Sequence, residues 1–158
     1  MLLGPHSPYL AALARLTFYR GFWSSWIVGE LVRKRTEWIA ERAAREHVGR
    51  SELRRRLRGS RGRVNALIDE LSQALISVDY SQSPKVDLAW LRDADDWPVM
   101  QTAQAAHADT LVTENWRDFP PGEERDGVTF IRTEPFLAAI YDKFPDARSR
   151  VEEFLKAS

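Results

Sequence analysis

The segment Asp93–Phe119 restricts the fold more than any other part of the chain, because an acidic cluster, a helix of small residues and a β-branched strand follow one another within it. Pro98 falls in the first turn of the expected helix, where proline is tolerated, and Asp95 or Asp96 can cap this helix. We expect it to end near His107. One narrow apolar face repeats at spacings of three and four residues: Val99, Met100, Ala103 and Ala106. Such a face can pack closely against a sheet.

A short strand is expected directly after this helix, from 108 to 113, because Leu-Val lies between two threonines there. The strand ends at Glu114-Asn115, where the chain must turn. In a parallel α/β sheet the carboxyl ends of strands form the binding edge. We therefore expect Asn115 and Asp118 at that edge, with Asp96 reaching it from the start of the helix.

A second apolar helix follows the Ser24-Ser25 pair, either of which can cap it. Its broad apolar stripe consists of Trp26, Ile27, Val28, Leu31 and Val32. Glu30 lies inside that stripe, and burying an unpaired carboxylate costs several kcal/mol. An ion pair with Lys34, four residues on, would contribute only about 0.3–0.5 kcal/mol on an exposed helix. Glu30 therefore needs a cation, a set of hydrogen bonds or access to solvent.

Charge is distributed unevenly although the net charge is zero. Between Arg33 and Arg63 twelve Lys and Arg stand against four Glu, whereas from Asp87 onward fifteen acidic residues stand against eight basic ones. This asymmetry predicts either a basic helical flank beside an acidic pocket, which suits an anionic polymer, or simply solvated helices with internal ion pairs. We expect two helices between 34 and 58, with the clearest break at 59–62.

The remaining segments complete an alternation of helices and strands. Expected helices are a short one from Ser7-Pro8 with Ser7 as a possible cap, one from Val64 to Ala74, one opened by Thr133 as cap with Pro135 early, and one from Ala147 to Leu155. Expected strands or extended segments are 22–23, 76–80 and 128–132; 81–85 and 120–126 are expected loops. His6, His47 and His107 have no metal-ligand spacing.

Several of these residues together resemble the PIN-domain family of metal-dependent ribonucleases found in bacterial toxin–antitoxin systems. The resemblance is carried by the acidic cluster, the Leu-Val-Thr strand and the Asn-x-x-Asp-Phe turn, closely over 93–119 and loosely over 8–137. Glu30 also matches a family position, because it follows a serine and a tryptophan and begins Glu-Leu-x-Arg. The resemblance implies a three-layer α/β fold with a central, mostly parallel sheet.

The resemblance further implies catalytic roles for Glu30, Asp96 and Asp118, and a Mg²⁺ or Mn²⁺ site formed by these three carboxylates with Asn115. Hard oxygen ligands suit both ions, and converging carboxylates raise one another's pKa unless a cation intervenes. Asn115 stands where much of the family has aspartate, and Asp93 and Asp95 are expected to be caps or supporting groups. RNA would be the substrate and a protein antitoxin a partner.

The chain departs from the family at its beginning. PIN domains open with a central strand that ends in the first metal-binding aspartate, and nothing before Ser7 has the length or the acid for it. Three explanations remain open: a natural start upstream, a strand supplied by a partner, or an inactive relative. An absent central strand leaves open backbone groups, so a homo-oligomer is expected.

Composition sets the remaining expectations. The 158 residues suffice for a single domain over 1–158, the absence of cysteine excludes thiolate chemistry, and no run is long enough for a membrane span. A cytoplasmic protein without membrane contact is therefore expected. The leading function is metal-dependent RNA hydrolysis. The alternatives are a non-catalytic PIN-like module that binds RNA or a regulatory protein, and a structural helical interaction protein.

Overall fold

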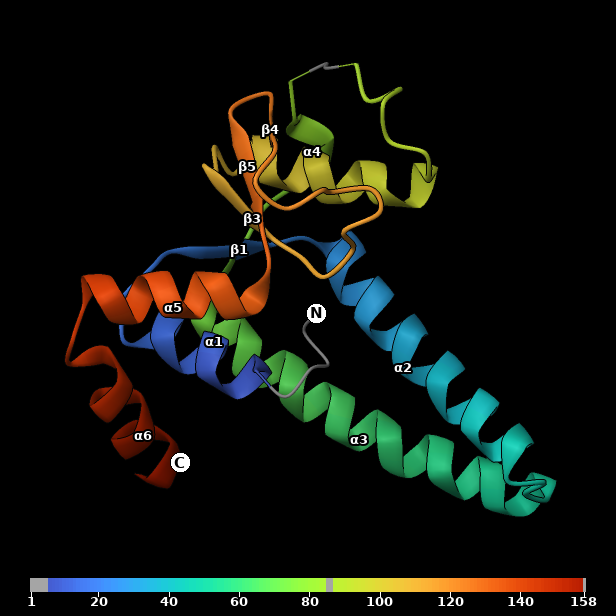
Figure 1. The fold of residues 1–158 in the computed structure, drawn as a ribbon. Coiled ribbons are helices and arrows are strands. Elements are labelled where there is room, and N and C mark those ends of the chain that lie inside the picture. The colour runs from blue at the N-terminus through green and yellow to red at the C-terminus, as the bar shows by residue number, and fades with distance from the viewer. Residues whose placement is uncertain (1–5, 85–86, 158) are drawn as a thin grey trace.

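The computed structural model describes residues 6–84 and 87–157 of the chain (Figure 1). The α-helices in these residues are α1 (Ser7–Arg15), α2 (Ser25–Arg45), α3 (Arg50–Ala74), α4 (Trp97–Ala105), α5 (Thr133–Lys143) and α6 (Ala147–Ala157). The strands are β1 (Gly21–Trp23), β2 (Leu75–Ser77), β3 (Thr110–Val112), β4 (Glu124–Arg125) and β5 (Val128–Ile131), and two 3-10 helices are η1 (Tyr80–Gln82) and η2 (Ala94–Asp96). The expectation that no strand precedes Ser7 concerns residues 1–5, which lie outside the described residues.

The strands form two small sheets. β1 pairs with β2 in parallel, with Gly21 opposite Leu75, and β3 pairs in parallel with β5, which also pairs antiparallel with β4. The predicted mixed α/β class is therefore confirmed. The described strands do not join into one central sheet, so the three-layer arrangement is not confirmed. β4 lies where a loop was expected, because Asp126 and Gly127, both with positive φ, form a two-residue turn that pairs 124–125 with β5.

Helices α2 and α3 form a long hairpin that projects away from the rest of the molecule (Figure 1). The predicted break at 59–62 is wrong, because α3 continues from Arg50 to Ala74 without interruption. The chain turns instead at 46–49, where His47 adopts a positive φ of 53°. Ser60 is buried within the continuous helix. Packing of the apolar face of α3 thus outweighs the low helix propensity of two glycines, about 1 kcal/mol each.

The starts of three helices test the predicted caps. Ser24 caps α2 through its hydroxyl, as predicted. Ser7 is instead the first helical residue of α1 and is buried, and the cap position falls on His6 without a side-chain cap bond. Thr133 is likewise the first residue of α5 rather than its cap. Its backbone N–H donates to the Glu114 carboxylate at 3.0 Å, so a residue just beyond β3 satisfies the open end of α5.

Three apolar clusters hold these elements together. The terminal cluster packs α1 against α5 and α6; its buried members are Leu10, Ala12, Leu13, Leu137, Ile140, Ala147 and Val151. The sheet cluster joins α4 to β5; its members are Leu88, Leu91, Met100, Ala103, Phe119, Val128 and Phe130. The hairpin cluster contains Ala11, Trp23, Leu31 and Leu71. Within the described ranges, no helix combines the length and apolarity needed to cross a membrane.

Candidate metal centre

Asp96 and Asn115 meet where the start of α4 approaches the end of β3. Asp96 is the last residue of η2, and Asn115 lies three residues beyond β3. The Asn115 side-chain amide donates a hydrogen bond to Oδ2 of Asp96 at 2.7 Å. The turn at Asn115 is itself closed by a bond from the Phe119 N–H to the Asn115 carbonyl at 3.0 Å. The structure therefore brings together two residues that lie nineteen positions apart, as the sequence predicted.

Asp118 completes this group on the same turn. Burial raises the pKa of Asp96 to about 6, and the charges of Asp118 and Asp93 add to the rise, while the hydrogen bond from Asn115 opposes it. Oδ1 of Asp118 is buried and has no hydrogen-bond partner in the described part of the chain. Phe119, which is 1% exposed in the sheet cluster, anchors the turn. Asp96 and Asp118 thus form an acidic pair in which a proton or a cation would be stabilised.

Asp93 and Asp95, which precede Asp96, hold the acidic segment in place, and neither caps α4. Asp93 accepts a hydrogen bond from the Asp95 N–H at 2.9 Å, so it caps η2, in agreement with its expected supporting role. Asp96 occupies the cap position of α4 but makes no side-chain cap bond, and Asp95 does not cap it either. The indole N–H of Trp26 donates to the Asp95 carbonyl at 3.1 Å. This bond fixes the first turn of α2 against the acidic segment.

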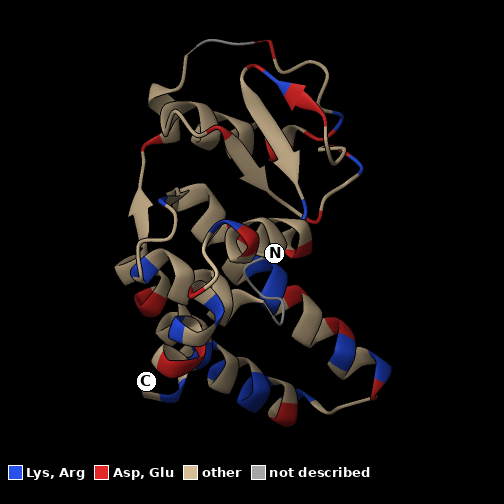
Figure 2. Cartoon of the chain, turned by 60° about the vertical axis from the view of Figure 1, so that its left-hand side comes forward, with Lys and Arg blue, Asp and Glu red and all other residues tan. Residues whose placement is uncertain are grey.

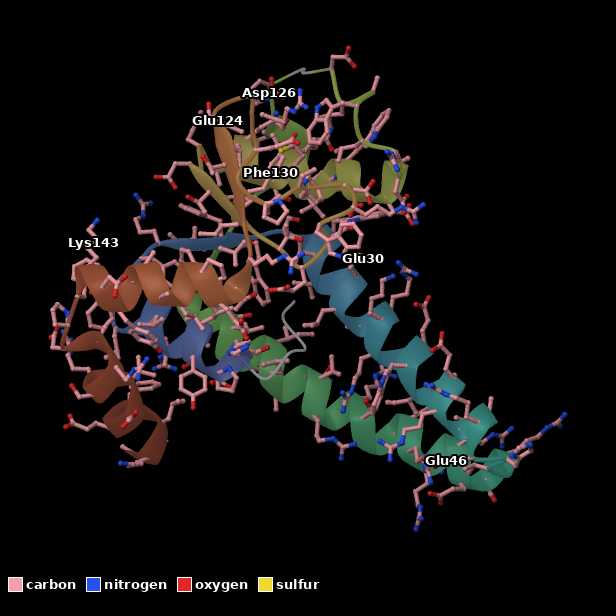
Figure 3. The ribbon with its side chains drawn as sticks, viewed as in Figure 1. Glu30, Glu46, Glu124, Asp126, Phe130 and Lys143 are labelled. Carbon is pink, nitrogen blue, oxygen red and sulfur yellow. The ribbon has the colours of Figure 1, made fainter. Side chains whose placement is uncertain are left out.

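Glu30 lies one helical turn beyond Trp26, near the beginning of α2 (Figure 3). The Trp26–Asp95 hydrogen bond brings this part of α2 next to the acidic segment. The Glu30 carboxylate accepts two hydrogen bonds from Arg33, each 2.6 Å long, so its ion-pair partner is Arg33 and not Lys34, the alternative considered from the sequence. The hydrogen bond from Arg33 lowers the pKa of Glu30, and the nearby charge of Asp93 opposes this effect. The Glu30 side chain is 26% exposed. Solvent access and Arg33 therefore offset the burial that the apolar stripe suggested.

A surface pocket of about 390 Å³ adjoins Glu30. Its lining residues are Ser25, Trp26, Gly29, Glu30, Arg33 and Asp95. Glu30 thus faces the acidic segment across this pocket, and Asp93 influences the pKa of both Glu30 and Asp96. Asp118 is a source of the Asp96 shift but not of the Glu30 shift. The structure consequently groups Asp96, Asn115 and Asp118 tightly and leaves Glu30 in an adjoining position, held by Arg33.

The donor atoms of the acidic pair fit a hard divalent cation in part. Among residues 6–84 and 87–157, no three acidic, histidine or cysteine side chains lie close enough to hold a metal by themselves. Asp96 and Asp118 offer carboxylate oxygens, one of them buried and unpartnered, and Asn115 offers an amide oxygen. Mg²⁺ keeps several waters and is often bound through one or two carboxylates. The arrangement therefore suits an ion that retains much of its water.

Two supporting contacts have no counterpart among the sequence predictions. The buried Thr102 hydroxyl lies 2.8 Å from the Ser24 hydroxyl, which joins α4 to the start of α2. The Trp26–Asp95 bond joins the same two regions. Pairs so distant in the chain leave no periodic signal. Of the three histidines, His47 and His107 are exposed, and His6 lies 3.7 Å from Glu134.

Comparisons of the chain with models of known protein families, with curated proteins and with solved structures found no match.

Proposed function

We propose that this chain is a PIN-like endoribonuclease that uses Mg²⁺ or Mn²⁺ to hydrolyse RNA phosphodiester bonds. The observation that carries the proposal is the acidic pair: Asp96 and Asp118 converge from separate elements, with the Asn115 amide beside them and a buried carboxylate oxygen left unpartnered. Two carboxylates that repel each other at neutral pH are a suitable arrangement for binding a cation. The motif over 93–119, which resembles the PIN family, supports the same reading.

In this proposal Asp96 and Asp118 hold the cation and Asn115 orients them. A bound divalent ion would polarise the scissile phosphate and lower the pKa of a bound water. Glu30 is the further metal-site carboxylate, and it would have to leave Arg33 to reach the ion. An RNA phosphate that bound Arg33 would release Glu30 for that role, because guanidinium groups pair with phosphate in the same bidentate manner as with carboxylate.

Thermal melting with Mn²⁺ tests the metal site directly. At one hundred times its dissociation constant the ion should stabilise the wild-type protein by about 2.7 kcal/mol, which corresponds to roughly 5–11 °C in Tm for a chain of this size. Asp96→Asn and Asp118→Asn should each abolish the shift. Asp95→Asn, which removes an exposed carboxylate next to the pair, is the matched control and should retain it.

RNA cleavage tests the chemistry. Wild-type protein with Mn²⁺ should cut single-stranded RNA, and Asp96→Asn, Asp118→Asn and Glu30→Gln should each lower the rate by at least about 100-fold if they remove charge stabilisation from the transition state. Cleavage that survives all three substitutions would exclude this site.

The second candidate function is a non-catalytic module that binds RNA or a regulatory protein. It is favoured by the bidentate pairing of Glu30 with Arg33 and by the absence of a three-carboxylate group among the described residues. No Mn²⁺ shift together with no cleavage would favour this candidate. The expected antitoxin and homo-oligomer remain predictions. β3 is an edge strand that pairs only with β5 among the described strands, so its other edge is open to a second copy. Light scattering would show whether copies associate.

A further inference from the structure

We propose that a stripe of four arginines on α3 binds the phosphate backbone of single-stranded RNA. The arginine stripe consists of Arg50, Arg54, Arg58 and Arg61. Their spacings of four, four and three residues place them along one flank of the helix over roughly 16 Å. All four are exposed. Figure 2 shows basic residues along both helices of the hairpin, with acidic residues interspersed among them.

The arginine stripe is a continuous row of arginines without internal partners. Arg45 and Arg63 also lack partners within the described residues, but Arg45 is on α2 and Arg63 lies on another flank of α3. No ion pair, hydrogen bond or ring contact within the described residues involves any of its four members. On another flank of the same helix, Arg56 bonds both Glu46 and Glu52, and Arg55 bonds Glu52. Like charges at spacings of three or four residues destabilise an isolated helix. A row of uncompensated guanidinium groups beside a compensated row is therefore best explained by an external anion.

The chemistry of the arginine stripe favours a phosphate polymer. Guanidinium groups bind phosphate through paired hydrogen bonds, and an extended row of them matches a repeating anion better than a single one. A membrane surface fits poorly, because an interfacial helix needs an apolar face to insert, whereas that of α3 is packed inside the protein through Val64 and Leu71. The choice of RNA among phosphate polymers rests on the proposed function.

The two ends of the arginine stripe lie at different distances from the body of the protein. α3 runs from the tip of the hairpin back to β2, so Arg50 is near the tip and Arg61 is nearer the body (Figure 1). β2 pairs with β1, and the chain from β1 leads directly to the first turns of α2, where Glu30 and Asp95 line their pocket. A strand of RNA lying along the arginine stripe would thus extend from the hairpin tip toward the acidic pair.

Fluorescence anisotropy of a labelled single-stranded RNA in EDTA tests the proposal without cleavage. Arg54→Gln/Arg58→Gln/Arg61→Gln should weaken binding on the order of 100-fold near 0.1 M salt and reduce the slope of log K against log salt by about 2, because three phosphate contacts are lost. Arg45→Gln/Arg55→Gln/Arg63→Gln removes the same charge from other faces of the hairpin and should retain most of the affinity. Circular dichroism melts confirm that both variants are folded.

Equal losses in the two triple variants would show that only net charge matters and would overturn the proposal, as would an unchanged affinity in the first. Tighter binding of anionic lipid vesicles or of polyglutamate than of RNA would assign the arginine stripe to a membrane or an acidic protein instead. Wild-type protein should bind the RNA in EDTA without cleaving it and should cleave it once Mn²⁺ is added. Failure of the proposed function therefore appears in cleavage alone, and failure of the arginine stripe appears in binding.

Discussion

The environment of Asp96 favours its neutral form, which links its protonation to folding. Its folded-state pKa is about 6 against an ordinary value of 3.8, mainly because of burial and secondarily because of Asp118. Between these two pH values the folded protein retains a proton that the unfolded chain has lost. The stabilisation from this proton is complete below pH 3.8 and is lost as pH rises through about 6.

Asp96→Asn should therefore raise the free energy of unfolding above pH 6 in the absence of metal. We expect about 1 kcal/mol at pH 8, allowing for solvent screening, or roughly 2–4 °C in Tm. The gain should disappear at pH 3.5, where the wild-type carboxyl is also neutral. Melts in EDTA at both pH values measure it, with Asp95→Asn as the control. An equal gain at both pH values would contradict the role of Asp96 ionisation.

For single residues, the sequence predicted which side chains lie together at the end of β3 better than it predicted their hydrogen-bond partners. Asp96, Asn115 and Asp118 were identified because the end of a strand and the start of a neighbouring helix share one edge. The partner of Glu30 was missed, because Arg33 and Lys34 lie three and four residues away on the same face of α2 and only the side-chain geometry distinguishes them. The cap roles of Thr133 and Ser7 were also wrong, since each helix begins one residue earlier than the cap pattern indicated.

The continuity of α3 depends on contacts that a local sequence pattern does not contain. Gly59 and Gly62 look like a break, yet Ser60 between them is buried, and so are Val64 and Leu71 after them. Leu71 packs in the hairpin cluster with residues of α1 and α2. Helix propensity is a weak guide where tertiary packing fixes the element. The strand at 128–131, by contrast, was predicted nearly as found, because a β-branched and aromatic run after a turn is a local signal. The segment expected to be a strand or extended at 76–80 overlaps β2 only at Ile76 and Ser77.

Replacing both glycines with alanine should stabilise the protein. A Cβ at Gly62 would meet nothing within 4 Å, and one at Gly59 would approach only the end of the Arg63 side chain at 3.9 Å. Each substitution should add about 1 kcal/mol, and the pair about 4–8 °C in Tm. Thermal melting measures the change. No gain, or a loss, would indicate that the chain does break at 59–62.

Gly122 provides the opposite control for the same experiment. It has a φ of +85° in the turn before β4, and its N–H donates to the Phe130 carbonyl at 2.8 Å. Gly122→Ala should lower the free energy of unfolding by about 1–2 kcal/mol, because an L-residue is strained there.

The whole molecule consists of apolar clusters joined by a few polar contacts. Phe130 packs against Phe119 with ring centroids 5.3 Å apart and against Trp90 at 5.9 Å, so three aromatic rings fill the sheet cluster. Hydrogen bonds from Thr102 to Ser24 and from Trp26 to Asp95 connect this region to the hairpin. The turn that carries Asp118 thus depends on a core distinct from the one that holds α2.

Phe130→Ala should lower the free energy of unfolding by about 3–5 kcal/mol, because it leaves a cavity in the sheet cluster. Trp116→Ala removes a larger side chain that is 63% exposed, and it should change the stability by less than about 0.5 kcal/mol. Urea unfolding followed by circular dichroism measures both variants. A small effect of Phe130→Ala would mean that the sheet cluster contributes little to global stability.

The pairing of β1 with β2 has a consequence for the order of folding. Gly21 and Leu75 are neighbours in the sheet although the whole α2–α3 hairpin lies between them in the chain. Closing so long a loop is entropically costly until the intervening segment is compact. Helices α2 and α3 should therefore pack against each other first, which brings β1 and β2 close enough to pair. Substitutions inside the hairpin interface should slow refolding, whereas those in the β1–β2 pair should mainly speed unfolding.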